Sequence, residues 1–206
     1  INWWIDSKPT TVFAMGELKF YGRENAKSRG KVYNYDRYTG NEEAKDDPFA
    51  LFLDSGEYAG SPLKNLYLDA EKVDGYIRDR NVFGDNITVE DTMAVTARYK
   101  NGVLLSYTLL AYSPWEGFRV AITGDKGRIE IFEEHGSHLI LGQSDEELTA
   151  TQEKGLNHSI TVFPMFAKPY DVEIQDAKGG HGGGDPVMLK DIFSNNPPPD
   201  PYNRMA

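Results

Sequence analysis

The chain has 206 residues, of which 39% are hydrophobic and 26% charged, and its formal net charge at pH 7 is −10. These proportions are typical of an ordinary folded domain, and no apolar run approaches the roughly 20 residues that a membrane-spanning helix requires. A net charge of this sign and size argues against nucleic-acid partners and anionic membrane surfaces, because both are bound by clustered lysine and arginine.

The first half of the chain predicts short elements separated by polar segments. Residues 1–5 predict a helix that ends before Pro9, and residues 10–21 have the apolar and β-branched content of a strand. Residues 22–47 are rich in Arg, Lys, Asn and Tyr, which predicts an exposed insertion or a long loop. Because helix-like sequence stands at both ends of the chain, we expect it to be part of a larger polypeptide.

Residues 91–113 predict a β-hairpin, because Asn101-Gly102 is the dipeptide that best tolerates a tight two-residue turn. Such a loop places Lys100 opposite Val103. One face would then carry Met93, Val95, Ala97 and Tyr99 beside Leu104, Ser106, Thr108 and Leu110. The other face is also largely apolar, whereas a solvated sheet face would be mostly polar. We therefore expect this sheet to be covered on both sides, once by its own domain and once by a partner.

The second half predicts mainly β-structure. Residues 118–123 alternate in polarity, the turn at 124–127 follows, and 129–132 forms a partner strand. Further short strands are predicted, at 138–141, 160–163 and 170–174. The total is about six to eight strands, the usual size of one sheet. A short amphipathic helix follows Asp185-Pro186, in which Asp185 would serve as the N-cap.

The string from Gly179 to Asp185 surrounds His181 with glycines. Glycine lets backbone approach a ligand closely, and a histidine can exchange a proton near neutral pH. His181 is therefore the candidate catalytic residue, although the string is also explained as a connector to the following helix. The chain contains neither the G-x-G-x-x-G nor the P-loop pattern, so we expect no nucleotide-binding fold within it.

Tyr112 and Trp115 are the candidate substrate-binding residues. They lie between two predicted strands and combine aromatic rings with polar tips, as side chains in sugar-binding clefts do. The alternative is that both belong to the edge of the sheet core. No metal site is predicted, because the chain has no cysteine and because His135 and His138 would point to opposite faces of a strand.

Several motifs, in this order and spacing, resemble the C-terminal domain of the Gfo/Idh/MocA oxidoreductases, the family of glucose–fructose oxidoreductase and inositol dehydrogenase. They are Asn2-Trp3-Trp4, Tyr99-Lys100-Asn101-Gly102, Glu116-Gly117, Gly124-x-x-Gly127-Arg128-Ile129-Glu130 and Gly180-His181-Gly182-Gly183-Gly184-Asp185. The resemblance implies an α+β fold, a large and mainly antiparallel sheet flanked by a few helices. Residues 1–206 would form a single C-terminal substrate-binding and oligomerisation domain. The implied reaction is hydride transfer between NAD(P) and a hydroxyl of a sugar, inositol or related polyol.

The same resemblance implies that the N-terminal Rossmann domain and the catalytic lysine of a Glu-Lys-Pro motif lie upstream of this chain. Ser7-Lys8-Pro9 and Ala167-Lys168-Pro169 lack the glutamate and do not replace that motif. We therefore expect the chain alone to bind no cofactor and to be inactive. It would supply the substrate cleft and a homo-oligomer contact through the sheet.

Two other readings of the sequence remain open, a stand-alone carbohydrate-binding module and a structural dimerisation module. The polypeptide ahead of Ile1 would separate them from the oxidoreductase, because only the oxidoreductase needs a dinucleotide-binding domain there. The compartment, cytoplasmic or periplasmic, is also left open by the sequence.

Overall fold

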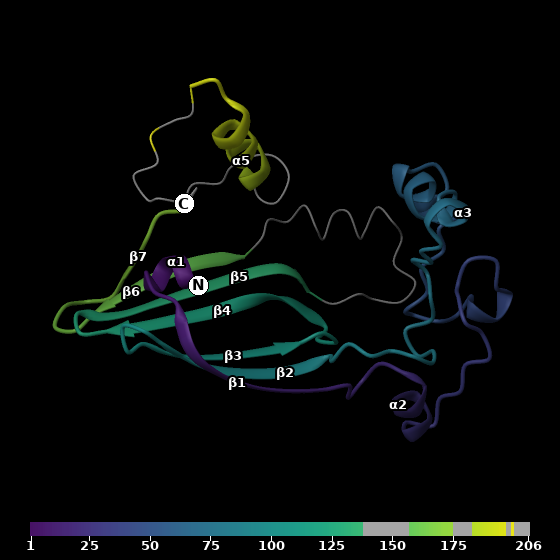
Figure 1. The fold of residues 1–206 in the computed structure, drawn as a ribbon, viewed down its shortest axis with the longest axis horizontal. Coiled ribbons are helices and arrows are strands. Elements are labelled where there is room, and N and C mark those ends of the chain that lie inside the picture. Colours follow the sequence, from purple (N-terminus) through teal and green to yellow (C-terminus); the bar gives the residue numbers. More distant parts are fainter. Residues whose placement is uncertain (138–156, 175–182, 197–198, 200–206) are drawn as a thin grey trace. The chain divides into compact units, whose positions relative to one another are not determined.

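The computed structural model describes residues 1–137, 157–174, 183–196 and 199 (Figure 1). These residues fall into two compact units. Unit 1 is Ile1–Pro114 and unit 2 comprises the described residues from Trp115 onward. Each unit holds one sheet, and every strand pairing in both sheets is antiparallel. The α+β class with mainly antiparallel strands is thereby confirmed, with the strands divided between two sheets.

Unit 1 contains a three-stranded sheet in the order β1-β2-β3 together with several short helical turns. Its elements are α1 (Asn2–Ile5), β1 (Pro9–Glu17), α2 (Arg23–Ser28), η1 (Glu42–Ala44), η2 (Gly56–Tyr58), η3 (Lys64–Leu68), α3 (Glu71–Asp74), β2 (Thr92–Tyr99) and β3 (Leu104–Leu110). The loops and helical turns between β1 and β2 gather toward one end of these strands (Figure 1). The predicted first helix and first strand are present, and the strand ends at Glu17 rather than at residue 21.

The β2–β3 hairpin is present, but the predicted register is wrong by one residue. Arg98 faces Leu104, and the amide of Tyr99 donates to the carbonyl oxygen of Val103 at 2.9 Å. The loop therefore has three residues and ends at Gly102, whose φ of 90° is the left-handed conformation that such loops require. Because strand side chains alternate, the slip changes which residues share a face of the sheet.

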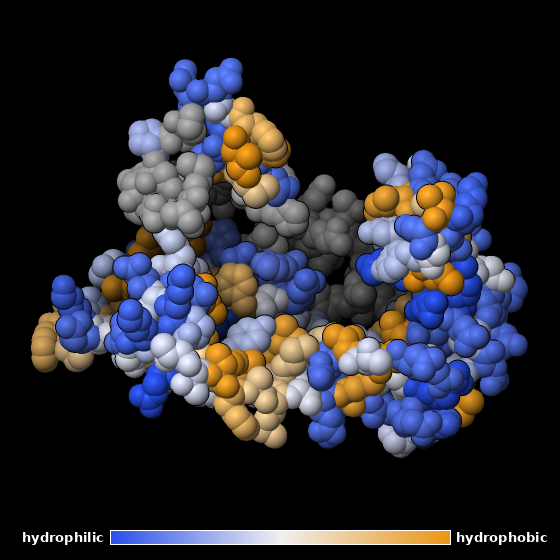
Figure 2. All heavy atoms as spheres, viewed as in Figure 1, coloured by the Kyte–Doolittle hydropathy of each residue, from blue (hydrophilic) through white to orange (hydrophobic). Residues whose placement is uncertain are grey.

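In the observed register, one face of the unit 1 sheet carries four large apolar side chains among small and polar ones. These four, which we call the Phe13 face, are Phe13, Met15, Leu104 and Leu110. Phe13 is 67% exposed and Leu104 is 65% exposed. Figure 2 shows apolar side chains exposed along the lower edge of the view, where β1 lies. Coverage of this face by a partner remains a prediction.

The segment 22–47 is not simply an exposed insertion, as the sequence predicted, because it supplies part of the buried core of unit 1. Tyr38 is 1% exposed and Ala44 is fully buried, and Tyr35 packs with them. The Tyr35 hydroxyl donates to Asp47 at 2.7 Å. Burial, together with this carboxylate, raises the pKa of Tyr35. Tyr33, Ala50, Leu51 and Phe52 pack against these residues and complete the cluster.

Unit 2 contains a four-stranded sheet in the order β4-β5-β6-β7 and one helix. Its elements are β4 (Trp115–Gly124), β5 (Gly127–Ser137), β6 (His158–Pro164), β7 (Tyr170–Asp171) and α5 (Gly184–Phe193). The predicted turn at 124–127 is confirmed, because Gly124 pairs with Gly127. The predicted strand at 138–141 lies outside the described residues. None of the described helices has the length and apolar content needed to cross a membrane.

The helix α5 starts two residues earlier than the sequence predicted, at Gly184 rather than at Pro186. Its N-cap is Gly183 in a left-handed conformation, so the expectation that Asp185 caps the helix is wrong. Asp185 stands instead in the first turn, where its negative charge is favoured by the helix dipole. A glycine occupies the cap because φ there is 86°, a value that other residues rarely adopt.

Candidate functional site

The two candidate site residues that the structure describes belong to different units. Tyr112 follows β3 in unit 1, and Trp115 begins β4 in unit 2. His181 lies outside the described residues. The surroundings of Tyr112 and of Trp115 are therefore described one at a time.

Tyr112 belongs to a cluster of stacked aromatic rings in unit 1. Its ring lies 4.8 Å from that of Phe20 with an interplanar angle of 11°, and the hydroxyl oxygens of Tyr112 and Thr92 lie 3.3 Å apart, within hydrogen-bond distance. The guanidinium of Arg29 lies 4.4 Å from the Phe20 ring centre on the same cluster. These contacts hold the Tyr112 ring in one place. They also fit the alternative in which Tyr112 is a core residue at the edge of the sheet.

The loop that carries Phe20 is held by Asp91, a buried carboxylate with 2% exposure. One oxygen accepts the amide of Lys19 at 2.8 Å, and the other accepts the amides of Phe20 and Tyr21 at 2.7 and 2.9 Å. Burial alone would raise the pKa of Asp91, but the amide hydrogen bonds and the Thr92 hydroxyl outweigh it and lower this pKa. The carboxylate therefore stays charged and fixes the loop.

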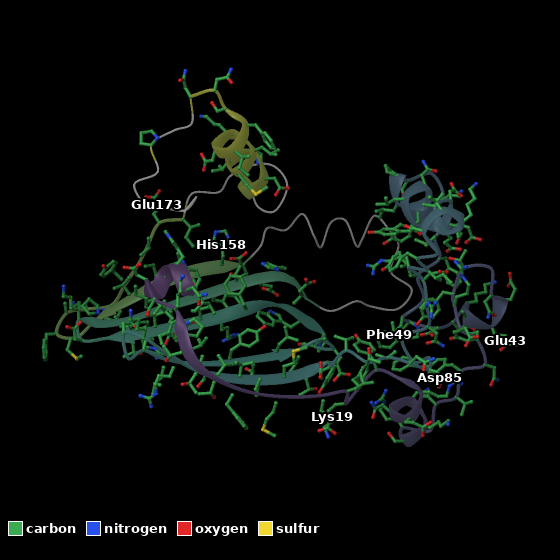
Figure 3. The ribbon with its side chains drawn as sticks, viewed as in Figure 1. Lys19, Glu43, Phe49, Asp85, His158 and Glu173 are labelled. Carbon is green, nitrogen blue, oxygen red and sulfur yellow. The ribbon has the colours of Figure 1, made fainter. Side chains whose placement is uncertain are left out.

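A hollow of about 170 Å³ opens beside this loop. It is lined by Leu18, Tyr21, Gly22, Arg23, Glu24, Asn25, Gly84, Asp85, Asn86 and Ile87. Arg23 donates to Asp85 at 2.7 Å, and Asn25 donates to the carbonyl oxygen of Tyr21 at 2.8 Å. Figure 3 marks Asp85, with Lys19 and Phe49 in the same region of unit 1. The lining thus combines the Tyr21 ring with amide, carboxylate and guanidinium groups, and such groups can bind the hydroxyl groups of a ligand.

Tyr21 adds to this lining a hydroxyl oxygen that can accept a hydrogen bond. Burial, followed by the charge of Asp91, raises the pKa of Tyr21, so its hydroxyl stays protonated at neutral pH. The hydroxyl donates to the carbonyl oxygen of Ala111 at 3.2 Å, which ties the lining to the segment that carries Tyr112. The sequence does not predict a site at Tyr21, Arg23 or Asp85. Their proximity depends on contacts between residues about 60 positions apart.

Trp115 forms a second aromatic platform on the unit 2 sheet. Its ring is stacked on Phe132 with centres 5.8 Å apart, and the guanidinium of Arg119 lies 4.7 Å from the Phe132 ring centre. The β4–β5 register shifts between Glu116 and Gly117, where β5 carries the extra residue His135 as a bulge. A Cβ built on Gly117 would lie 2.7 Å from the Trp115 ring. The Trp115 ring therefore packs against a backbone position at which any larger side chain would collide with it.

The opposite face of the β5–β6 pair brings Glu133 next to two histidines. His135 Nε2 lies 2.8 Å from a Glu133 carboxylate oxygen, and Glu133 pairs in register with His158, which Figure 3 labels. Among the described residues, no three histidine or acidic side chains are placed to share a metal ion.

Comparisons with known proteins agree with the motifs. A family model described as the C-terminal alpha/beta domain of an oxidoreductase family, Gfo/Idh/MocA, matches residues 3–197. The protein named "Putative oxidoreductase YteT", from Bacillus subtilis (strain 168), is 30% identical over 224 aligned residues. The alignment covers 100% of this chain and 46% of that protein, so the chain spans about half the length of this curated relative. No solved structure matches the chain significantly.

Proposed function

Since the chain belongs to the Gfo/Idh/MocA oxidoreductase family as its C-terminal alpha/beta domain, we propose that it is the substrate-binding and subunit-contact part of an NAD(P)-dependent oxidoreductase. The substrate class would be a sugar, inositol or related polyol. The observation that carries the proposal is the family match over residues 3–197. The chain aligns with 46% of a relative named as an oxidoreductase, which is compatible with a Rossmann domain in the rest of the protein.

The antiparallel sheets support the proposal that the substrate is bound by this chain and the dinucleotide by the N-terminal domain, because Rossmann domains bind dinucleotides on parallel sheets. In the proposal, NAD(P) on the N-terminal domain takes a hydride from the substrate carbon. This chain would hold the polyol so that the reacting carbon is positioned for that transfer. His181 would accept the hydroxyl proton as the carbon loses its hydride. The rings of Tyr112 and Trp115 would contact the substrate.

The test is an assay of the full-length protein with a panel of polyols and both dinucleotides. We expect His181→Ala to lower kcat by roughly 100-fold and to remove one limb of the pH profile, as loss of a general base does. Trp115→Ala should raise KM about tenfold, while Tyr112→Ala should raise KM less if its role is mainly structural. His135→Ala is the matched control, because His135 already bonds to Glu133 on a strand.

The outcome distinguishes the alternatives. Dinucleotide-dependent turnover that is unaffected by His181→Ala would remove the role of His181. Sugar binding without any turnover would favour the carbohydrate-binding module. Self-association with neither sugar binding nor turnover would favour the dimerisation module.

We also propose that the Phe13 face is covered by a second copy of the chain. Exposed apolar patches of this kind mark interaction sites in soluble proteins, and the face lies on a regular sheet that can pack on a related sheet. Replacement of Phe13 by glutamate is expected to weaken dimerisation at least about tenfold, because a charge would be buried in the contact. Val32→Glu is the control, since Val32 is 70% exposed in a loop away from the sheet. Sedimentation equilibrium gives the dissociation constants, and a Phe13→Glu protein that still dimerises like the wild type would contradict the proposal.

A further inference from the structure

A second hollow lies among the loops and helical turns between residues 51 and 78 of unit 1. Its volume is about 160 Å³, and it is lined by Leu51, Leu53, Tyr58, Leu63, Tyr67 and Arg78. Most of this lining consists of leucine side chains and tyrosine rings. A polyol placed here would lose water without gaining enough hydrogen bonds. The lining therefore favours an apolar ring over a sugar.

The walls of this hollow are fixed by local contacts. Leu53 is 1% exposed, and its amide donates to the Thr39 hydroxyl at 3.0 Å. Tyr67 lies on η3, a π-helical turn in which the Asp69 amide donates to the carbonyl oxygen of Lys64 at 3.0 Å. The side chains of the same two residues, Lys64 and Asp69, form an ion pair with an N–O distance of 2.8 Å, which stabilises the turn. π-Helical turns are rare and frequently occur at functional sites.

Arg78 supplies the one positive charge in the lining. Its guanidinium carbon lies 5.6 Å from the Tyr67 ring centre, within the range of a cation–π contact. The neighbouring cations Arg37 and Lys64 lie 2.7 and 2.8 Å from carboxylate oxygens. Among the side chains that the structure describes, no carboxylate forms such a pair with Arg78. A guanidinium stacked on a ring can bind a carboxylate through two parallel hydrogen bonds.

We propose that this hollow binds a small carboxylate that carries a single ring, with the ring against the leucine and tyrosine side chains and the carboxylate on Arg78. An apolar cavity of roughly 150 Å³ accommodates one benzene molecule. The observed volume of about 160 Å³ is therefore large enough for one six-membered ring. The chain carries a net charge of −10, so its overall electrostatic potential repels anions. An anion is attracted only where a local cation such as Arg78 outweighs this potential. This site is independent of the oxidoreductase activity proposed above.

The test uses benzoate as the probe, titrated into the full-length protein and followed by saturation-transfer NMR. We expect saturable binding with a dissociation constant near the millimolar range, as is usual for a ligand of this size. Acetate lacks the ring and benzyl alcohol lacks the charge. Each of them should bind at least about tenfold more weakly than benzoate, because each loses one of the two contacts.

Two variants assign the binding to this hollow. Arg78→Gln should weaken benzoate binding at least about tenfold, since it removes a charged hydrogen-bonding partner. Arg80→Gln removes the same charge from an exposed residue outside the lining, and it should leave the affinity within about twofold. Leu63→Trp should fill the hollow and abolish binding. No saturable binding, equal binding to Arg78→Gln, or acetate binding as tight as benzoate would overturn the proposal.

Discussion

Replacing Asp91 with asparagine is expected to lower the free energy of unfolding by about 2–4 kcal/mol. The two carboxylate oxygens accept the amides of Lys19, Phe20 and Tyr21, and one of them also accepts the Thr92 hydroxyl. An asparagine turns one acceptor into a donor that faces other donors, so two hydrogen bonds to a charged group are lost in a buried place. Urea denaturation measures the loss. It should appear as a lower midpoint with an unchanged slope.

The matched control is Asp54→Asn, because Asp54 is exposed and lies in the same unit. Its expected effect is within about 0.5 kcal/mol, as for ordinary surface substitutions. If both variants were equally stable, the amide hydrogen bonds to Asp91 would contribute nothing to the fold. The loop bearing Phe20 and Tyr21 should also become more accessible in Asp91→Asn, with faster exchange of their amide hydrogens.

The pH dependence of stability follows from the same contacts. The pKa of Asp91 is lowered in the folded state from its ordinary value of 3.8, so the folded protein binds this proton less readily than the unfolded chain. The stabilisation from Asp91 is therefore fully present above about pH 4 and is lost as the pH falls through the folded pKa. Below about pH 4, the unfolding free energy of Asp91→Asn should decline less steeply than that of the wild type.

The sequence predicted those parts of the fold that depend on local patterns. The β2–β3 hairpin and the Gly124–Gly127 turn were both located, because alternating strands around glycine-containing turns are local signals. The hairpin register was not predicted, because Asn101 also donates to the carbonyl oxygen of Ile5 at 3.1 Å. That contact joins segments 96 positions apart, and no local pattern contains it.

The buried polar network of unit 1 was missed for a similar reason. Asp79 is 1% exposed and accepts the Arg37 guanidinium and the Thr39 amide, each at 2.7 Å. Segments held by such contacts have no apolar periodicity, so a prediction made from their composition assigns them to an exposed loop. The residues lining the hollow at Tyr21 are brought together by this kind of contact. They could not be chosen from the sequence alone.

The platform under Trp115 is a case where more could have been predicted. Once the turn at Gly124 and Gly127 is recognised, counting back along both strands places Arg119 opposite Phe132, as observed. Both residues then share the face that carries Trp115. The bulge of β5 opposite Gly117 has no such signal, because a glycine in a strand fits several backbone conformations.

Gly117→Ala is expected to cost about 2–6 kcal/mol in unfolding free energy and to displace Trp115 from its platform. The Cβ would lie 2.1 Å from the carbonyl oxygen of Glu133, and φ at this position is 156°. Overpacking and a strained backbone conformation each cost about 1–3 kcal/mol. The β4–β5 pair must separate locally to relieve the contact between this Cβ and the Glu133 carbonyl oxygen. The Trp115 indole then no longer packs against residue 117.

Gly124→Ala in the same strand is the control, because its Cβ would meet no atom within 4 Å. Thermal denaturation should show a large loss for Gly117→Ala and a shift close to zero for Gly124→Ala. Near-ultraviolet circular dichroism should show a change in the tryptophan bands only for Gly117→Ala, because Trp115 packs on that residue. A fully stable Gly117→Ala protein would mean that Gly117 does not lie against Glu133 and the Trp115 ring, and Trp115 would then lose the support that makes it a candidate for substrate contact.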